Sequence, residues 1–146
     1  LCLERIEALD VAETRFLDYG CGSGILAIGA LLLGAREATA YDIDPQAITA
    51  TRSNAAQNSV AERLTATTAK DEVGNDYDIV AANILARPLM DLADELALRV
   101  RPGGRLILSG ILETQSGTLI EAYRRQVRFD EPLLRDGWVC LAGTRL

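Results

Sequence analysis

The sequence contains no histidine among its 146 residues. A Ser-His-Asp triad, a Cys-His dyad and a histidine-ligated zinc site are therefore excluded in this chain. The three cysteines, Cys2, Cys21 and Cys140, are widely spaced, and no Cys-x-x-Cys pair occurs. This pattern argues against a disulfide scaffold and against a cysteine-ligated metal, so we expect no metal site. It is typical of a protein in a reducing cytoplasm.

Positive charge is also scarce. Fifteen Lys and Arg residues stand against 21 Asp and Glu residues, which gives a formal net charge of −6. Binding to a phosphate backbone needs clustered cations, so we expect no direct contact with nucleic acid. Glycines interrupt the longest uncharged stretch, Tyr19–Ala35. A membrane span needs roughly 20 mainly apolar residues, and we therefore expect no membrane segment.

The chain opens on Leu1-Cys2-Leu3-Glu4, without an initiating methionine or the basic region of a signal peptide. We expect it to be part of a longer protein. Hydrophobic residues make up 49% of the sequence and charged residues 25%. A chain of this length and composition can form one domain with a real core, but not two full domains. We predict a single domain, residues 1–146.

Strand-like and helix-like segments alternate along most of the chain. The predicted strands are Arg15–Tyr19, Ala38–Tyr41, Arg63–Thr67, Tyr77–Ala82 and Arg105–Ser109. The predicted helices cover Leu1–Leu9, Gly24–Leu33, 45–57, an apolar stripe from Leu85 to Val100, and Glu113–Gln126. Such alternation predicts a parallel sheet covered by helices.

The C-terminal part breaks this alternation. Phe129–Arg135 and Trp138–Thr144 flank Asp136-Gly137, a strong signal for a β-hairpin. We therefore predict an α/β fold whose mostly parallel sheet is closed by an antiparallel C-terminal hairpin. Ligands of such sheets bind at the carboxyl ends of the strands. The loops after the predicted strands are thus the places to look for a site.

The loop after the first strand reads Asp18-Tyr19-Gly20-Cys21-Gly22-Ser23-Gly24. Glycines allow a ligand to approach the backbone closely, and a tight turn without a ligand is the alternative. Their spacing, at Gly20, Gly22 and Gly24, differs from the Gly-x-Gly-x-x-Gly fingerprint that places a pyrophosphate at a helix N-terminus. The carboxylate of Asp18 would repel a pyrophosphate but would suit a ligand that carries a positive amine.

Asp42 ends the second predicted strand. A carboxylate there can accept both hydroxyl protons of a ribose. The alternative is a turn or capping acid, but Asp44, followed by Pro45, already provides a helix cap. Together with Asp18 and the glycines, Asp42 indicates an adenosine ligand with an amino-acid tail, namely S-adenosylmethionine.

Asn83 directly follows the strand Tyr77–Ala82. At that place it could accept a hydrogen bond from a substrate amine, although an Asn that caps the next helix is the alternative. Cys21 is a conceivable nucleophile, but its position inside the glycine loop argues against a covalent role.

Four segments resemble the ribosomal protein L11 methyltransferase (PrmA) family: Asp18–Leu33, Tyr41–Asn58, Asn83–Leu89 and Ser109–Leu112. The run Asn83-Ile84-Leu85-Ala86 followed by Arg87-Pro88-Leu89 is specific to that family. It occupies the place where amino-group methyltransferases of nucleic acid and of protein glutamine carry an Asn/Asp-Pro-Pro-aromatic motif. The resemblance covers essentially the whole chain.

The resemblance implies a Rossmann-like class I S-adenosylmethionine-dependent methyltransferase, with a seven-stranded sheet whose last strand is antiparallel. It implies methylation of lysine ε-amines and of the N-terminal α-amine of a large-subunit ribosomal protein. By motif match, the cofactor would be bound by Asp18, Gly20, Cys21, Gly22, Gly24, Asp42 and Asn83, and Asn83 would also face the target amine near the methyl donor. The adenine would lie near Thr67–Asp71. The family's N-terminal recognition domain, its linker and a cofactor-binding Thr/His segment would lie outside this chain.

Two other readings compete with this one. An NAD-dependent oxidoreductase could use Asp42 for its ribose, but the glycine spacing and Asp18 argue against it. A non-enzymatic interaction domain, with a methyltransferase fold that has lost its cofactor, is the second, and the intact set of Asp18, the glycine loop and Asp42 argues against it. Methyl transfer to an amine requires a neutral nucleophile and alignment more than a strong base, which agrees with the absence of histidine.

Overall fold

The structure is a computed structural model that describes all residues from Leu1 to Leu146. Its strands are β1 (Arg15–Tyr19), β2 (Glu37–Tyr41), β3 (Leu64–Thr67), β4 (Tyr77–Asn83), β5 (Val100–Leu112), β6 (Val127–Phe129), β7 (Leu133–Arg135) and β8 (Trp138–Arg145). Its helices are α1 (Cys2–Ala8), α2 (Ile25–Leu32), α3 (Pro45–Gln57), α4 (Ala86–Asp91), α5 (Ala93–Arg99) and α6 (Glu113–Tyr123), with short 3₁₀ turns at Ala61–Arg63 and Lys70–Glu72.

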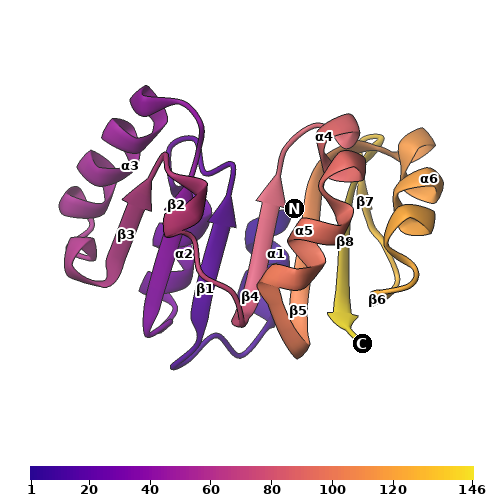
Figure 1. Ribbon diagram of the computed structural model, residues 1–146, viewed down its shortest axis with the longest axis horizontal. Helices are drawn as coiled ribbons and strands as arrows, with labels where there is room; N and C mark the ends of the chain where they lie inside the picture. The colour runs from indigo at the N-terminus through magenta and orange to yellow at the C-terminus, as the bar shows by residue number, and fades with distance from the viewer.

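The strands form one sheet in the order β3-β2-β1-β4-β5-β8-β6, and the short β7 also pairs with β8. Strands β1 to β5 are parallel to one another, whereas β8 runs antiparallel to β5. Figure 1 shows the parallel strands pointing to the top of the view and β8 pointing down. The predicted α/β class, a mostly parallel sheet with antiparallel C-terminal strands, is therefore confirmed.

Helices cover both faces of the sheet because successive strand residues bury alternate side chains on opposite faces. Phe16 belongs to the core between the sheet and α1, α2 and α3, while Leu17 belongs to the core beneath α4, α5 and α6. None of these helices is both long enough and apolar enough to cross a lipid bilayer.

The predicted strand Phe129–Arg135 is instead two short strands, β6 and β7, which pair with the two ends of β8. Pro132 lies in the break, and because proline has no backbone N–H it cannot donate to the ladder. Asp130 still donates its N–H to the carbonyl of Ala142 at 2.8 Å. The sheet thus counts eight strands rather than the expected seven.

The apolar stripe from Leu85 to Val100 also differs from the prediction of one helix. Helix α4 ends at Asp91, α5 begins at Ala93, and Val100 pairs with Tyr77 as part of β5. Leu85 is not in the core: it precedes α4 and is 71% exposed. Helical periodicity identified apolar positions here but could not separate a buried residue from one that faces a cavity.

Tyr123 ties α6 to α4. Its ring is fully buried, and its hydroxyl donates to the carbonyl of Leu89 at 2.6 Å.

Replacing Tyr123 by Phe should lower the free energy of unfolding by about 0.5–1.5 kcal/mol, because one buried hydrogen bond is lost. Urea denaturation measures the change. Tyr41→Phe is the control, since that hydroxyl makes no hydrogen bond within the protein. Equal stability of Tyr123→Phe and the parent would contradict this account.

Candidate functional site

The glycine loop after β1 folds back over the end of β2. The N–H groups of Gly20 and Cys21 both donate to the carbonyl of Tyr41, at 2.7 and 2.9 Å. This contact places the loop at the carboxyl edge of the sheet, between the end of β2 and the start of α2. The sheet order changes direction between β1 and β4, and ligands of open α/β sheets bind at such a switch point.

Gly20, Gly22 and Gly24 all have positive φ angles, of 79°, 54° and 83°. A Cβ at Gly24 would lie 2.7 Å from the side chain of Thr51 in α3, whereas one at Gly22 would meet nothing within 4 Å. Gly24 is therefore required for the close packing of α2 against α3. At this position the glycine has a structural role that needs no ligand. Gly22 leaves open space above the loop, which is what a ligand needs.

The carboxylate of Asp42 joins three segments. Its Oδ2 accepts the N–H of Gly22 at 3.0 Å, and its Oδ1 accepts the N–H of Asp44 at 3.0 Å. Asp44 caps α3 by accepting the N–H of Gln46 at 2.9 Å, as the sequence predicted. Asp42 thus stabilises the glycine loop and the start of α3. Each of its oxygens still has a second lone pair that can accept a hydrogen bond.

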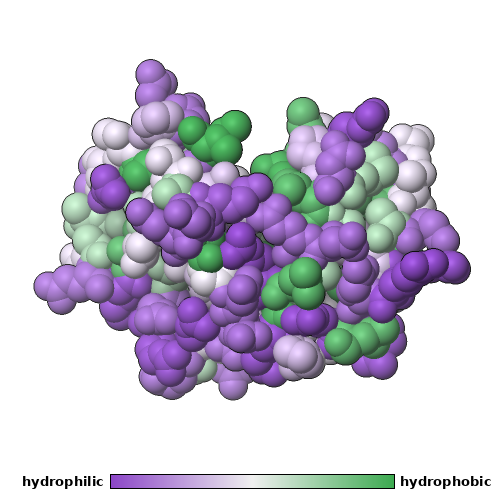
Figure 2. Space-filling view, viewed as in Figure 1, coloured by the Kyte–Doolittle hydropathy of each residue, from purple (hydrophilic) through white to green (hydrophobic).

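A cavity of about 430 Å³ opens beside Asp42, and we call it the Asp42 cavity. It is lined by Tyr19, Gly20, Tyr41, Asp42, Ile43, Lys70, Ile84, Leu85, Pro88 and Leu92. In Figure 2 the upper edge of the molecule is hollowed, with hydrophobic side chains on both sides of the hollow. The volume falls within the roughly 300–1,000 Å³ typical of small-molecule sites.

Several of these lining residues were not predicted from the sequence. Ile43 is 80% exposed and Leu85 71% exposed, and they are the two most exposed large apolar side chains of the protein. Ile84 lies over the loop, because a Cβ at Gly20 would be only 2.6 Å from its Cγ2. The position of Ile43, an apolar residue directly after the predicted ribose-binding Asp42, is the one feature of the sequence that could have indicated its place in the cavity wall. Lys70 lies within the segment Thr67–Asp71 that the sequence had indicated.

Asp18 is buried behind the loop, with 1% of its surface exposed. Its Oδ2 accepts the N–H of Ala27, in the first turn of α2, at 3.1 Å. Asp18 does not line the Asp42 cavity, so its contact with the amine of a ligand remains a prediction. Burial raises the pKa of this carboxyl, the hydrogen bond from Ala27 lowers it and the charge of Asp42 raises it; together they bring the pKa to about 7.

Cys21 is also buried in the loop, where its Sγ lies 3.4 Å from Oγ1 of Thr51. Burial raises the pKa of its thiol to about 11, so the thiol stays protonated at neutral pH and is a poor nucleophile. Any contribution of Cys21 to ligand binding would therefore come from its backbone.

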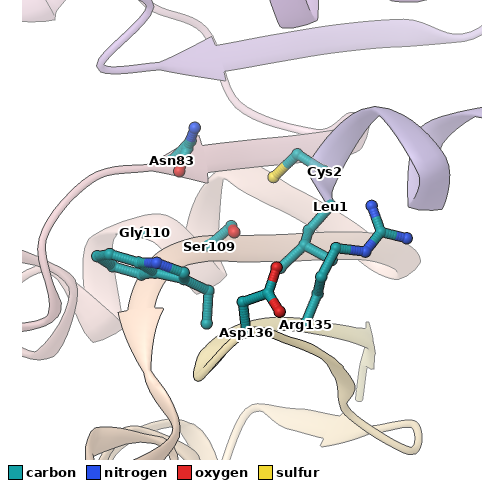
Figure 3. A pocket seen from close by; sticks show the side chains of 8 residues that line it. Leu1, Cys2, Asn83, Ser109, Gly110, Arg135 and Asp136 are labelled. Atoms are coloured by element: carbon teal, nitrogen blue, oxygen red, sulfur yellow. The ribbon is translucent and has the colours of Figure 1, made fainter.

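Asn83 lines a second cavity, of about 280 Å³, which we call the Asn83 cavity. Its walls come from β4 and β5 (Asn83, Ser109, Gly110), from the start of the chain (Leu1, Cys2) and from the C-terminal hairpin (Arg135, Asp136, Trp138). Figure 3 shows these residues around the open space. Asn83 is exposed at the end of β4 and pairs in register with Ser109, so the sheet fixes its position.

Consecutive residues line the two cavities: Asn83 lines one and Ile84 lines the other. Of the predicted site residues, Gly20 and Asp42 share the Asp42 cavity, while Gly22 and Gly24 shape its loop. The arrangement can hold an adenosine-like ligand by its ribose hydroxyls at Asp42 and present a second molecule to it beside Asn83.

A parallel sheet of this order, with a glycine loop after β1 and an acid after β2, has the fold of class I S-adenosylmethionine-dependent methyltransferases. An RNA methyltransferase from Salinibacter ruber, solved with S-adenosyl-L-homocysteine, is similar at a TM-score of 0.78 with 20% identity, covering 98% of this chain and 89% of that one. This likeness shows the fold alone.

The chain belongs to the ribosomal protein L11 methyltransferase (PrmA) family, whose model matches residues 1–146. It is 52% identical to the ribosomal protein L11 methyltransferase of Methylococcus capsulatus, over 99% of this chain and 50% of the relative. The crystal structure of a ribosomal protein L11 methylase from Lactobacillus delbrueckii subsp. bulgaricus matches at a TM-score of 0.91 with 33% identity, covering 99% of this chain and 76% of that one. The chain spans about half the length of the curated relatives it matches.

Asp18 predicts a pH dependence of stability. Its pKa in the folded chain is about 7, above the ordinary value of 3.8 for an aspartate, so between these values the native state binds more protons than the unfolded state. The contribution of Asp18 to the free energy of unfolding should therefore be highest below about pH 4. It should fall as the pH rises from about 4 to 7.

Asp18→Asn keeps an acceptor for Ala27 and removes the ionisation. Urea denaturation from pH 4.5 to 8 should show the stability of the variant, relative to the parent, rising with pH and levelling off above about 7. Parallel pH profiles for the two proteins would show that Asp18 does not titrate in this range.

Proposed function

We propose that residues 1–146 form the catalytic domain of an S-adenosylmethionine-dependent protein methyltransferase. Its substrate would be ribosomal protein L11 of the large subunit, methylated on lysine ε-amines and on the N-terminal α-amine in the cytoplasm. Membership of the PrmA family and the class I fold support the reaction class. The observation that carries the proposal is that the residue next to Asn83 in the chain, Ile84, lines the Asp42 cavity, so the end of β4 borders both cavities.

The residues around the Asp42 cavity fit S-adenosylmethionine. Asp42 offers one remaining lone pair on each oxygen to the two ribose hydroxyls. Ile43 and Ile84 provide apolar walls, which suit the adenine ring. Gly20 has no side chain, and a Cβ there would press into Ile84 and fill the space between loop and wall. In this proposal Gly20, Gly22 and Gly24 border the methionine portion.

Bound S-adenosylmethionine supplies a methyl group that is already activated by its sulfonium. The protein must then align an amine with that group, and alignment alone can supply about 7–11 kcal/mol of the barrier. A free Lys amine has a pKa of about 10.4 and is mostly protonated at neutral pH. The Asn83 side-chain carbonyl can accept a hydrogen bond from the amine and orient its lone pair. The proton must leave before attack, and solvent can take it.

Calorimetric titration of the chain with S-adenosylhomocysteine and with NAD is the experiment that tests this proposal. We expect saturable binding of S-adenosylhomocysteine and none of NAD. Preference for NAD would favour an oxidoreductase, and failure to bind either nucleotide would favour a domain without a cofactor.

Asp42→Ala should weaken S-adenosylhomocysteine binding by about 1.5–3 kcal/mol, because a charged acceptor of hydrogen bonds is lost. This corresponds to a dissociation constant roughly 10- to 150-fold higher. Stability should also fall, since Gly22 and Asp44 lose their acceptor. Asp44→Ala is the matched control: it removes the cap of α3, at a cost of about 1 kcal/mol, but leaves the cavity wall intact. If both variants bind equally well, Asp42 is only a structural acid.

Asn83→Ala should lower the methylation rate far more than the affinity for S-adenosylmethionine, because its proposed partner is the substrate amine. We expect a loss of roughly 10-fold or more, the effect of about 1.4 kcal/mol in the transition state. The measurement is single-turnover methylation of ribosomal protein L11 by a full-length family member that carries this domain. A variant that loses cofactor affinity and rate in equal measure would place Asn83 in the cofactor site instead.

A further inference from the structure

We propose that Asp136 attracts the protonated amine of the substrate into the Asn83 cavity, so that this cavity selects a primary ammonium group carried by a polypeptide. The inference rests on the proposed function, since it assigns a substrate-binding residue to the same site. Asp136 is far from Asn83 in the sequence, and the C-terminal hairpin brings it to the cavity wall. In Figure 3 the two side chains lie on opposite sides of the open space.

The electrostatics of this cavity support the assignment. Two charged side chains line it, Arg135 and Asp136. The guanidinium of Arg135 is engaged by the carboxylate of Glu4 in α1, with Nη1 on Oε1 and Nη2 on Oε2 at 3.0 Å. Asp136 takes part in none of the ion pairs or side-chain hydrogen bonds of the protein. Asp136 is therefore the one charged side chain of the cavity without a partner in the protein, and once the amino group of Leu1 is acylated its negative charge favours a cation.

The backbone holds Asp136 in place. Asp136 and Gly137 connect β7 to β8, with φ angles of 53° and 82°, and Arg135 pairs in register with Trp138. Two positive φ angles are typical of the tight hairpin turn that favours Asp-Gly and Asn-Gly. The turn alone would accept Asn at this position, so Asp136→Asn removes the charge while keeping the backbone geometry.

The neutral and polar members of the cavity complete the site. Asn83 provides a side-chain carbonyl, and Ser109 is its partner across the β4–β5 ladder. An ammonium drawn in by Asp136 would meet the Asn83 carbonyl, release a proton to solvent and become a nucleophile. A neutral group, such as an acetylated lysine, would gain nothing from Asp136. Asp136 therefore favours an unmodified, protonated amine over a neutral group.

Trp138 makes the binding step directly observable. It is the one tryptophan of the chain, it lines the Asn83 cavity, and 48% of it is exposed. Its fluorescence can be followed while Nα-acetyl-lysine amide is added to the chain saturated with S-adenosylhomocysteine. The neutral Nε-acetyl derivative serves as the ligand control. Because Leu1 also lines this cavity, the chain is acetylated at its amino terminus to remove that positive charge.

We expect a saturable signal with Nα-acetyl-lysine amide that weakens as salt is added, and little response to the Nε-acetyl derivative. Asp136→Asn should raise the dissociation constant about three- to fivefold, the size expected for an exposed charge pair. Glu131→Gln is the matched control, an exposed acid of the same hairpin region that does not line the cavity, and it should bind like the parent.

Equal affinity of Asp136→Asn and the parent for the lysine amide would overturn this inference, as would equal binding of the charged and acetylated ligands. Calorimetry with S-adenosylhomocysteine on the same samples separates the two proposals. If S-adenosylhomocysteine binds but the lysine amide shows no charge preference, the role of Asp136 fails and the proposed function stands. If S-adenosylhomocysteine does not bind, the proposed function fails first.

Discussion

The hydrogen bonds of the Asp42 carboxylate are the contact on which the rest of the site depends. With one oxygen on the N–H of Gly22 and the other on the N–H of Asp44, Asp42 connects the glycine loop, the end of β2 and the start of α3. These are the segments that form one wall of the Asp42 cavity. The same carboxylate thus shapes the loop and remains able to accept ribose hydroxyls, so structure and binding cannot be separated at this residue.

The opposite wall depends on the switch in strand order. Because β4 lies next to β1 rather than β3, the loop that follows it faces the glycine loop, and Ile84 comes to lie over Gly20. One residue earlier, Asn83 turns to a second cavity, bordered by the C-terminal hairpin. The Asp42 cavity is thereby made by the loops after β1 and β2, by Lys70 and by the segment after β4, and the Asn83 cavity by β4, β5, the start of the chain and the hairpin.

Two residues of the glycine loop, Asp18 and Cys21, do not line a cavity because their side chains are buried. Asp18 and Cys21 belong to the glycine motif, yet both side chains point into the protein, toward Ala27 and Thr51. Sequence spacing placed the glycine loop between a strand and a helix, as the structure has it, but spacing does not say which members of a loop face a ligand. A buried carboxyl such as Asp18 instead affects stability, because desolvation disfavours its charged form.

Local periodicity and turn chemistry were enough to predict the α/β class, the parallel strands β1 to β5, the cap at Asp44 and the hairpin turn at Asp136-Gly137. Pro132 is also a local signal for the break in the last predicted strand but one, because proline cannot donate to a β-ladder. Sheet order and packing, in contrast, bring Ile43, Lys70 and Ile84 to one cavity, and Asp136 to the cavity that Asn83 lines. Such contacts join segments far apart in the chain, and their geometry depends on sheet order and packing, which no local pattern records.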